Sequence, residues 1–186
     1  MSDEIRSYCE EAYEKMITLR RDIHKHPEAA CLEYRTASIV IQTLRDLGYE
    51  VHYGPEAMNL KVVKNILPTE AEANGAIRRA ISEGADPKLV EAMKYNLTAV
   101  VGVLHCGEGP VIGLRADMDA LNVIENQSPE HIPNREGFAS IHPKVSHACG
   151  HDAHTAIGLA VAAVMRRLAD EGKIHGTLKL FFQPGE

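Results

Sequence analysis

The sequence predicts an α/β fold built on a mixed β-sheet. Segments with helical periodicity alternate with short apolar, β-branched runs, which is the pattern of an α/β domain. The last of these runs, residues 177–182, is almost continuously apolar, which indicates a strand covered on both faces. The chain of 186 residues is long enough to bury one sizeable core. We therefore expect an α/β unit, and we find no internal repeat.

The N-terminal part of the chain is predicted to be helical. Apolar residues recur at spacings of three and four over residues 3–25 and again from Tyr34 to Leu47. Gly48 is the expected C-terminal stop of the second helix, because glycine adopts the left-handed conformation that ends many helices. Residues 49–53 then alternate as a short strand does.

A helical insertion is expected next. Thr69 and Glu72 have the spacing of a capping box, and Asp86 followed by Pro87 combines an N-cap residue with proline at the first helical position. These signals predict an insertion at about 69–95 that consists of two short helices, 69–83 and 87–95.

The following segments predict a hairpin and a long loop. Residues 97–104 and 111–115 are apolar, β-branched runs separated by the turn-forming residues 106–110, which is typical of a β-hairpin. Residues 122–146 are polar and contain several prolines, as expected of a long surface loop. Loops of this length are often functional.

One more helix and one more strand complete the prediction. Ile157, Val161, Val164 and Leu168 form an apolar stripe, and Glu171-Gly172 ends the helix. The final strand would then lie at the edge of the sheet, and an exposed apolar edge promotes aggregation. The chain stops directly after this strand, so we expect an interrupted chain.

Composition excludes several classes of function. The formal net charge is −6 and no run is rich in Lys or Arg, which disfavours binding to nucleic acid or to an anionic membrane. No stretch approaches 18 apolar residues, and the acidic N-terminus does not resemble an export signal. Four scattered cysteines do not predict a disulfide scaffold. We expect a cytoplasmic protein with reduced thiols.

Residues 147–155 carry the strongest chemical signal. Cys149 and His151 are two residues apart, so in an extended segment their side chains point the same way, and Gly150 lets the backbone turn between them. A thiolate beside an imidazole is a partial ligand set for zinc or a similar divalent ion. The N-terminus of the following helix is expected to favour the thiolate, and Asp152 to cap that helix or to orient His151.

Two other interpretations of this cluster remain open. Cys149 could be a small buried hydrophobe among histidines of a surface loop. Cys149 could also be a nucleophile with a histidine as its base, although the sequence shows no separate carboxylate to orient that histidine.

Two further sites lie at predicted strand ends. Asp117 and Asp119 follow the strand 111–115, at the carboxyl edge where open α/β sheets gather ligands, and one of them is expected to hydrogen-bond a ligand histidine. Taken alone, this Asp-x-Asp pattern is typical of a turn and helix cap. Glu186 follows the last strand and is a candidate general base, although a lone C-terminal glutamate is usually solvated. His24 and His26 are read as structural, and Cys106 as incidental.

Four segments in order resemble the M20 metallopeptidase family, in its amidohydrolase branch. The segments are RRDIHKHPE (20–28), RADMDAL (115–121), HACGHDAHT (147–155) and FQPGE (182–186). Within this branch, the inserted helices and the run 135–140 favour the subgroup of the p-aminobenzoyl-glutamate hydrolases. The resemblance implies a three-layer, mixed-sheet, zinc-exopeptidase-like catalytic domain, of which residues 1–186 are the N-terminal part without the lid and dimerisation domain.

The resemblance also implies a site with two divalent ions, Zn or Mn. By position, Cys149 and His151 match metal ligands of the family and Glu186 matches its general base, while Asp117, Asp119 and Asp152 would support the ligands. A ligand glutamate after Glu186 and two later ligand histidines are absent, so we expect weak metal affinity and little activity in this chain. Gly185 replaces a more usual alanine.

The implied reaction is hydrolysis of the amide bond between an acyl or aroyl group and an amino acid, with p-aminobenzoyl-glutamate as the candidate substrate. The partner is thus a small amide substrate, and the complete enzyme could be a homo- or heterodimer. The alternative is a non-catalytic truncated fragment or a partner subunit.

Overall fold

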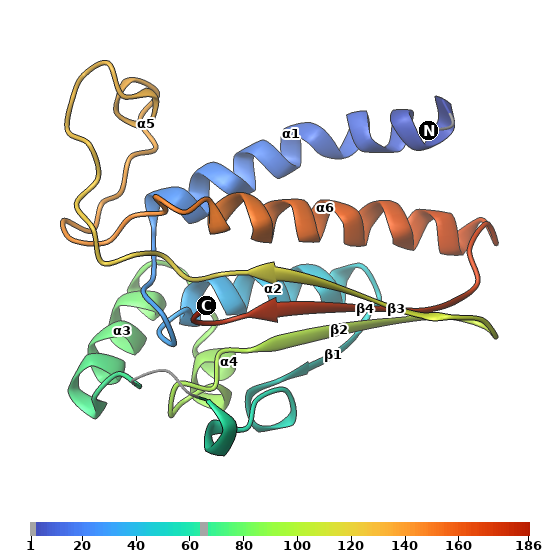
Figure 1. Ribbon diagram of the computed structural model, residues 1–186, viewed down its shortest axis with the longest axis horizontal. Coiled ribbons are helices and arrows are strands. Elements are labelled where there is room, and N and C mark those ends of the chain that lie inside the picture. The colour runs from blue at the N-terminus through green and yellow to red at the C-terminus, as the bar shows by residue number, and fades with distance from the viewer. Residues whose placement is uncertain (1–2, 64–66) are drawn as a thin grey trace.

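A computed structural model describes residues 3–63 and 67–186, and it contains one four-stranded sheet with helices packed against it (Figure 1). The order of the strands in the sheet is β1-β2-β4-β3. The strands are β1 (Glu50–Tyr53), β2 (Val100–Cys106), β3 (Val111–Asp117) and β4 (Gly176–Gln183). The helices are α1 (Asp3–Lys25), α2 (Tyr34–Asp46), α3 (Glu70–Ser82), α4 (Pro87–Ala92), α5 (Ile132–Arg135) and α6 (His151–Asp170), with 3-10 turns at Gly54–Glu56 and Leu60–Val62.

The sheet is mixed, as predicted, but the predicted hairpin is wrong. β4 lies between β2 and β3, antiparallel to β2 and parallel to β3, so β2 and β3 are not neighbours. The connection from β2 to β3 passes closely over the start of β4, since a Cβ on Gly109 would lie 2.9 Å from the Cα of Gly176. A strand that comes some 60 residues later in the chain thus takes the place that local sequence gives to a hairpin partner.

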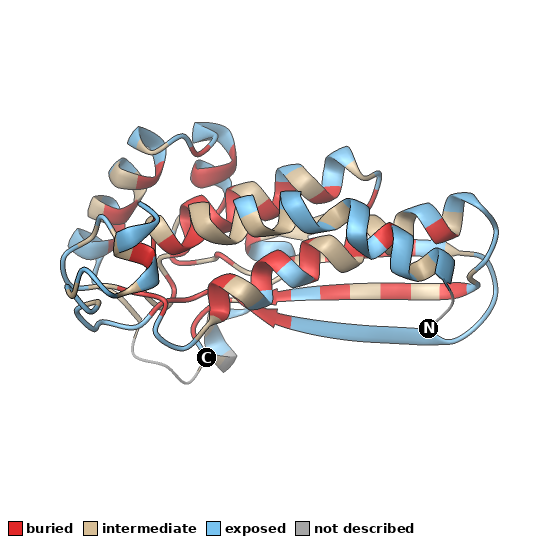
Figure 2. Ribbon diagram, turned by 90° about the horizontal axis from the view of Figure 1, so that it is seen from above, coloured by how far each residue is buried: buried red, intermediate tan, exposed pale blue. Residues whose placement is uncertain are grey.

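Helices α2 and α6 lie against one face of the sheet, and α1 forms a second tier over α6 (Figures 1 and 2). α6 runs along β3 and β4, α2 covers β1 and β2, and α1 packs against α6. The core between them buries large apolar side chains from helices and strands alike, including Tyr34, Ile41, Leu44, Leu180 and Phe182. This arrangement confirms the predicted α/β class with a mixed sheet.

The sequence signals for helix ends are confirmed. Thr69 and Glu72 form a reciprocal capping box at the start of α3, and Asp86 caps α4 with Pro87 in its first turn. Gly48, which follows α2, has a φ of +75°. The two helices of the predicted insertion are therefore present as α3 and α4, each slightly shorter than expected.

The apolar stripe predicted for this helix lies on α6 but is only partly buried. Ile157 is 49% exposed, whereas Leu168 is buried, and the face toward the sheet carries mainly small residues such as Gly158 and Ala162. A Cβ on Gly158 would lie 3.0 Å from the ring of Phe182. At Gly158, α6 therefore lies so close to the sheet that a larger side chain would not fit beside Phe182.

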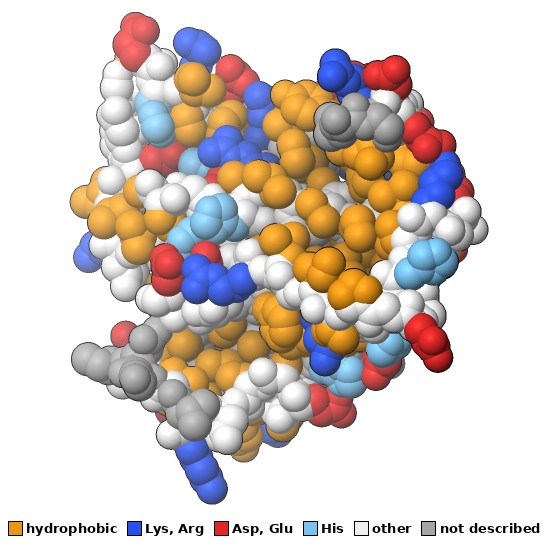
Figure 3. Space-filling view, turned by 45° about the vertical axis from the view of Figure 1, so that its right-hand side comes forward, with side chains coloured by type: hydrophobic (Ala, Val, Ile, Leu, Met, Phe, Trp, Pro, Cys, Tyr) orange, Lys and Arg blue, Asp and Glu red, His pale blue; other side chains and the backbone are white. Residues whose placement is uncertain are grey.

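The last strand, β4, is not at an edge of the sheet; the edge strands are β1 and β3, and β3 is the more exposed of the two. Figure 2 shows β3 exposed along most of its length, while burial alternates along β4. Val111 and Ile112 are 67% and 59% exposed, and Phe181 of β4 is 41% exposed, so β4 is not covered on both faces. The side of the molecule shown in Figure 3 also carries many hydrophobic side chains on its surface. Among the described residues, no helix is both long and apolar enough to cross a membrane.

We predict that this edge makes the chain self-associate. Ile112→Lys places a charge on β3, and charged edge strands resist pairing with other chains. The variant should therefore lower the apparent mass in light scattering with little change in melting temperature. Ile81→Lys is the control, because Ile81 is also exposed but lies on α3. Equal self-association of all three proteins would contradict the prediction.

Candidate metal centre

Three sequence motifs meet at the carboxyl end of the parallel strand pair. The register of β3 and β4 places Asp117 beside Gln183, and Glu186 follows the end of β4. Helix α6 begins at His151 next to both strand ends, as shown by contacts of His151 with Asp119 and Glu186. Residues more than 60 positions apart in the chain thus share one edge of the sheet.

His151 lies at the centre of this edge and is buried. Its Nδ1 is 3.1 Å from both the backbone oxygen and Oδ1 of Asp119. Because both neighbours are acceptors, Nδ1 carries the proton, and in the neutral ring the lone pair is on Nε2. Nε2 lies 3.2 Å from Oε2 of Glu186 and 4.0 Å from Oδ2 of Asp117. The Nε2 lone pair thus faces Glu186 and Asp117, while the Asp119 carboxylate holds the opposite ring nitrogen. A carboxylate in the position of Asp119 is what orients a metal-binding histidine.

Asp117 and His154 complete a group that sequence reasoning did not assemble. One ligand atom each from Asp117, His151 and His154 lie within 4.8 Å of one another. Oδ2 of Asp117 accepts a hydrogen bond from Arg115 at 2.8 Å, and Nδ1 of His154 lies 3.2 Å from it. Oδ1 of Asp117 is buried without a hydrogen-bond partner among the described residues. The i, i+3 spacing of the two histidines on α6 was the signal that could have found His154.

Cys149 lies beside this group but is not part of it. The residue is exposed, and its Sγ is 3.9 Å from the backbone oxygen of Asp119, which Nδ1 of His151 also approaches. Partial desolvation of the sulfur raises the pKa of the Cys149 thiol above its ordinary value. The backbone N–H of His151, at the start of α6, lowers this pKa as expected of a helix N-terminus, but the desolvation outweighs it.

Asp152 was expected to cap α6 or to orient His151, but its carboxylate contacts other residues. The N-cap of α6 is Gly150, with a φ of +89° and no side-chain cap. Oδ2 of Asp152 instead lies 2.8 Å from Nδ1 of His24 and 2.7 Å from Nε of Arg20. Asp152 therefore ties the start of α6 to the end of α1.

His24 bridges two buried carboxylates. Its Nε2 lies 2.8 Å from Oε1 of Glu125, opposite the contact with Asp152. Burial alone would lower the pKa of His24, but the hydrogen bonds to Asp152 and Glu125 outweigh it and raise the pKa above 6.5. The same contacts outweigh burial at both carboxyl groups and lower the pKa of Asp152 and of Glu125. The structural interpretation of His24 is thus supported, and its partners lie more than 100 residues away.

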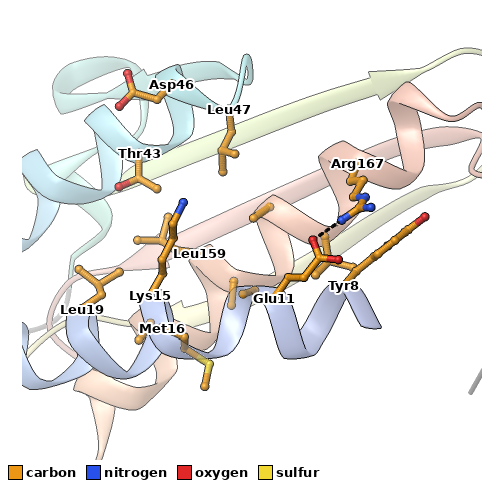
Figure 4. Close-up of a pocket in the computed structure, with 15 residues that line it drawn as sticks. Tyr8, Glu11, Lys15, Met16, Leu19, Thr43, Asp46, Leu47, Leu159 and Arg167 are labelled. Atoms are coloured by element: carbon orange, nitrogen blue, oxygen red, sulfur yellow. Dashed lines mark hydrogen bonds and ion pairs between the residues drawn. The ribbon is translucent and has the colours of Figure 1, made fainter. Parts of the chain in front are cut away.

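Two cavities lie near these elements. One, about 370 Å³, is a groove between α1, α2 and α6, lined by apolar side chains such as Met16 and Leu159 and bordered by the Glu11–Arg167 ion pair (Figure 4). The other, about 520 Å³, lies between α1 and the loop before α6 and is lined by His24, Glu125 and His147, among others. Burial lowers the pKa of His147 to about 4. Neither cavity is lined by the residues around His151.

We predict that His24→Gln destabilises the chain by about 3 kcal/mol, because it leaves two buried carboxylates without their shared cation. A histidine with a raised pKa stabilises the fold fully below the unfolded value of 6.5, and this contribution is lost as pH rises through the folded pKa. Urea unfolding from acidic to alkaline pH should show this loss in the wild type and not in the variant. His52→Gln, which removes an exposed ion-paired histidine, should cost less than about 1 kcal/mol. Equal effects of the two variants would refute the role of His24.

Comparison with known proteins agrees with this geometry. Residues 113–186, which contain most of β3 and all of α6 and β4, match the model of peptidase family M20/M25/M40. The chain is 40% identical to indole-3-acetyl-aspartic acid hydrolase of Enterobacter agglomerans over 98% of its length and 41% of the relative's. It is also 40% identical to one of the subunits of p-aminobenzoyl-glutamate hydrolase of Escherichia coli, over 92% of the chain and 39% of that protein.

Solved structures give the same result. An aminobenzoyl-glutamate utilization protein from Klebsiella pneumoniae superposes with a TM-score of 0.77 at 31% identity, over 98% of this chain and 39% of the other. The YXEP protein of Bacillus subtilis, described as a dinuclear metal binding peptidase of family M20, has a TM-score of 0.64 at 26% identity, over 95% of this chain and 36% of its own. The chain therefore belongs to the M20 family of peptidases and amidohydrolases and spans about 40% of the length of the curated relatives it matches.

Proposed function

We propose that this chain is the N-terminal part of the catalytic domain of a metal-dependent amidohydrolase. The reaction is hydrolysis of the amide bond between an acyl or aroyl group and an amino acid, and p-aminobenzoyl-glutamate is the candidate substrate. The observation that carries the proposal is the meeting of Asp117, His151 and Glu186 at one edge of the sheet. Two relatives named for hydrolysis of an acyl-aspartate and an aroyl-glutamate support this substrate class.

The residues at this edge fit a divalent cation. Oδ1 of Asp117 is buried without a partner among the described residues, and the lone pair of His151 Nε2 faces the same carboxylate. We propose His151 and Cys149 as ligands, with Asp117 and His154 as further donors at the same edge. Thiolate and imidazole suit zinc, whereas added carboxylates suit manganese. Bound there, the metal would supply Lewis-acid polarisation of the amide carbonyl and a lowered pKa for water.

We propose that Glu186 moves the proton. Its Oε1 lies 3.2 Å from Nη2 of Arg115 and its Oε2 3.2 Å from Nε2 of His151, so the carboxylate already lies at the ligand edge. As a general base it would accept a proton from water and deliver it to the leaving amine nitrogen. Asp119 would hold His151 in the required tautomer.

Several parts of the proposal extend beyond this chain. Because the chain spans about 40% of its relatives, the second metal ion, the remaining ligands and the dimer contacts would come from sequence that it lacks. We also propose a cytoplasmic location and no nucleic-acid or membrane partner, from the net charge of −6. The alternative, a non-catalytic fragment or partner subunit, is an outcome of the tests below.

We predict measurable but weak binding of Zn²⁺ or Mn²⁺ by the 186-residue chain in isothermal titration calorimetry. His151→Ala should abolish it, and Asp119→Asn should lower the affinity by about 10- to 100-fold, because the orienting carboxylate is lost. His105→Ala is the control, since His105 is exposed on β2 and far from the site in the sheet. Unchanged binding in His151→Ala would show that the metal lies elsewhere.

We predict that a chain extended to the full length of its relatives hydrolyses p-aminobenzoyl-glutamate or indole-3-acetyl-aspartate when supplied with zinc or manganese. Glu186→Gln should lower kcat by about 10²- to 10⁴-fold, as expected for loss of a general base. The matched control is Glu108→Gln, which changes an exposed carboxylate in the connection before β3. Absence of hydrolysis of both substrates would favour the non-catalytic alternative.

A further inference from the structure

Two buried glutamates lie in the segment between α1 and α2: Glu28 ends the segment 20–28, and Glu33 lies outside the four segments named above. Glu28 and Glu33 are 1% and 0% exposed. The carboxylate of Glu28 accepts hydrogen bonds from the backbone N–H groups of Arg35 and Thr36. It therefore satisfies free N–H groups in the first turn of α2. Glu33 has a different set of partners, and these reach the candidate metal centre.

The Glu33 carboxyl group joins three segments of the chain. Oε1 accepts hydrogen bonds from the backbone N–H groups of Cys31 at 2.8 Å and of Gly185 at 3.0 Å. Oε2 contacts Oγ1 of Thr98 at 2.7 Å, just before β2. The contact with Gly185 spans 152 positions of sequence and reaches the turn that follows β4.

This turn determines the position of Glu186. Gly185 has a φ of +55°, a left-handed conformation that costs glycine little, and it directly precedes Glu186. The N–H of Glu186 in turn lies 3.4 Å from Oδ1 of Asp119, the atom that also holds His151. The backbone at 185–186 is thus held between Glu33 on one side and Asp119 on the other.

On the assignment of Glu186 as general base, we propose that Glu33 is a positioning residue of this site. Its side chain holds the backbone turn at Gly185 and thereby fixes where the carboxylate of Glu186 lies relative to His151. Glu33 itself contacts no reacting group, and it acts through the N–H of Gly185.

The surroundings of Glu33 indicate that it acts as a neutral carboxylic acid. Complete burial, opposed by its hydrogen bonds and reinforced by the charge of Asp119, raises the pKa of Glu33 to about 8. The other titratable groups that interact with it are Cys31 and Tyr34, and neither supplies a positive charge. Oγ1 of Thr98 donates to Oε2 of the carboxylate. In the acid form Oε1 still accepts from both N–H groups, and the contact with Thr98 reverses, so that the Oε2 hydroxyl donates to Oγ1. Glutamine can reproduce this pattern, with its amide oxygen and nitrogen in the same places.

The test is NMR of the Gly185 amide in the 186-residue chain. In the wild type its chemical shift should titrate with a midpoint near pH 8, following Glu33. Glu33→Gln should keep the amide protected from hydrogen exchange and remove the titration. Glu33→Ala should lose protection by about tenfold or more, the equivalent of one hydrogen bond. Glu28→Gln is the matched control, because it changes an equally buried carboxyl group that does not contact Gly185.

The outcomes separate positioning from general stability. A Gly185 amide that does not titrate in the wild type, or that changes as much in Glu28→Gln as in Glu33→Ala, would overturn the role of Glu33. If Glu33→Ala does not fold, the comparison of the wild type with Glu33→Gln still decides the question. None of these readouts needs activity, so loss of the proposed function in the extended chain would leave the coupling between Glu33 and Gly185 standing. In that extended chain, Glu33→Ala should lower kcat with little change in KM, and Glu33→Gln should restore kcat.

Discussion

The parallel pairing of β3 and β4 is the constraint on which the rest of the structure depends. Parallel neighbours end at the same edge of a sheet, and their register aligns Asp117 with Gln183. The turn after β4 then carries Glu186 to the side chain of His151, and Asp119 reaches the same ring from the segment after β3. α6 can enter this edge only because Gly158 lets it lie against Phe182. If β3 instead paired with β2, these carboxylates would not converge on His151.

Buried charge is the second organising feature of this end of the molecule. His24 compensates Asp152 and Glu125, which joins α1, the start of α6 and the long loop. A buried carboxylate is costly unless it is paired and hydrogen-bonded, so these contacts hold the three segments in one arrangement. Glu33 differs, because burial raises its pKa to about 8 even though its hydrogen-bond partners donate to it and by themselves lower that pKa. Ion pairs therefore hold His24 and its neighbours, whereas Glu33 is held by hydrogen bonds without a positive charge beside it among the described residues.

Features that depend on neighbouring residues were predicted well, whereas features that depend on residues far apart in the sequence were not. Capping at Thr69 and Asp86 and the periodicity of α1 and α2 are local properties, and the sequence predicts them well. Strand order is non-local, and the turn residues 106–110 could not reveal that β4 enters between β2 and β3. The apolar stripe predicted on α6 likewise does not reveal that Ile157 is exposed while Leu168 is buried, because burial depends on how closely the helix approaches the sheet.

The candidate site shows the same division. The positions of Asp117 and Asp119 at a strand end and of His151 at a helix start were sufficient to predict the edge of the sheet where these side chains meet. The contact of Asp152 with His24 spans 128 positions and has no local signature, so sequence alone pairs Asp152 with His151 instead. Glu33 escapes sequence reasoning for the same reason, since its role depends on Gly185 at the other end of the chain.

X-ray absorption spectroscopy of the zinc-loaded chain tests the central claim most directly, because it identifies the atoms around the ion. The account predicts nitrogen and oxygen scatterers at about 2.0–2.2 Å together with one sulfur at about 2.3 Å, the distances of zinc to imidazole, carboxylate and thiolate. The sulfur should disappear in Cys149→Ser and the imidazole signal should weaken in His151→Ala. A spectrum with oxygen neighbours alone, unchanged in both variants, would contradict the existence of a metal centre at the edge formed by β3, β4 and α6.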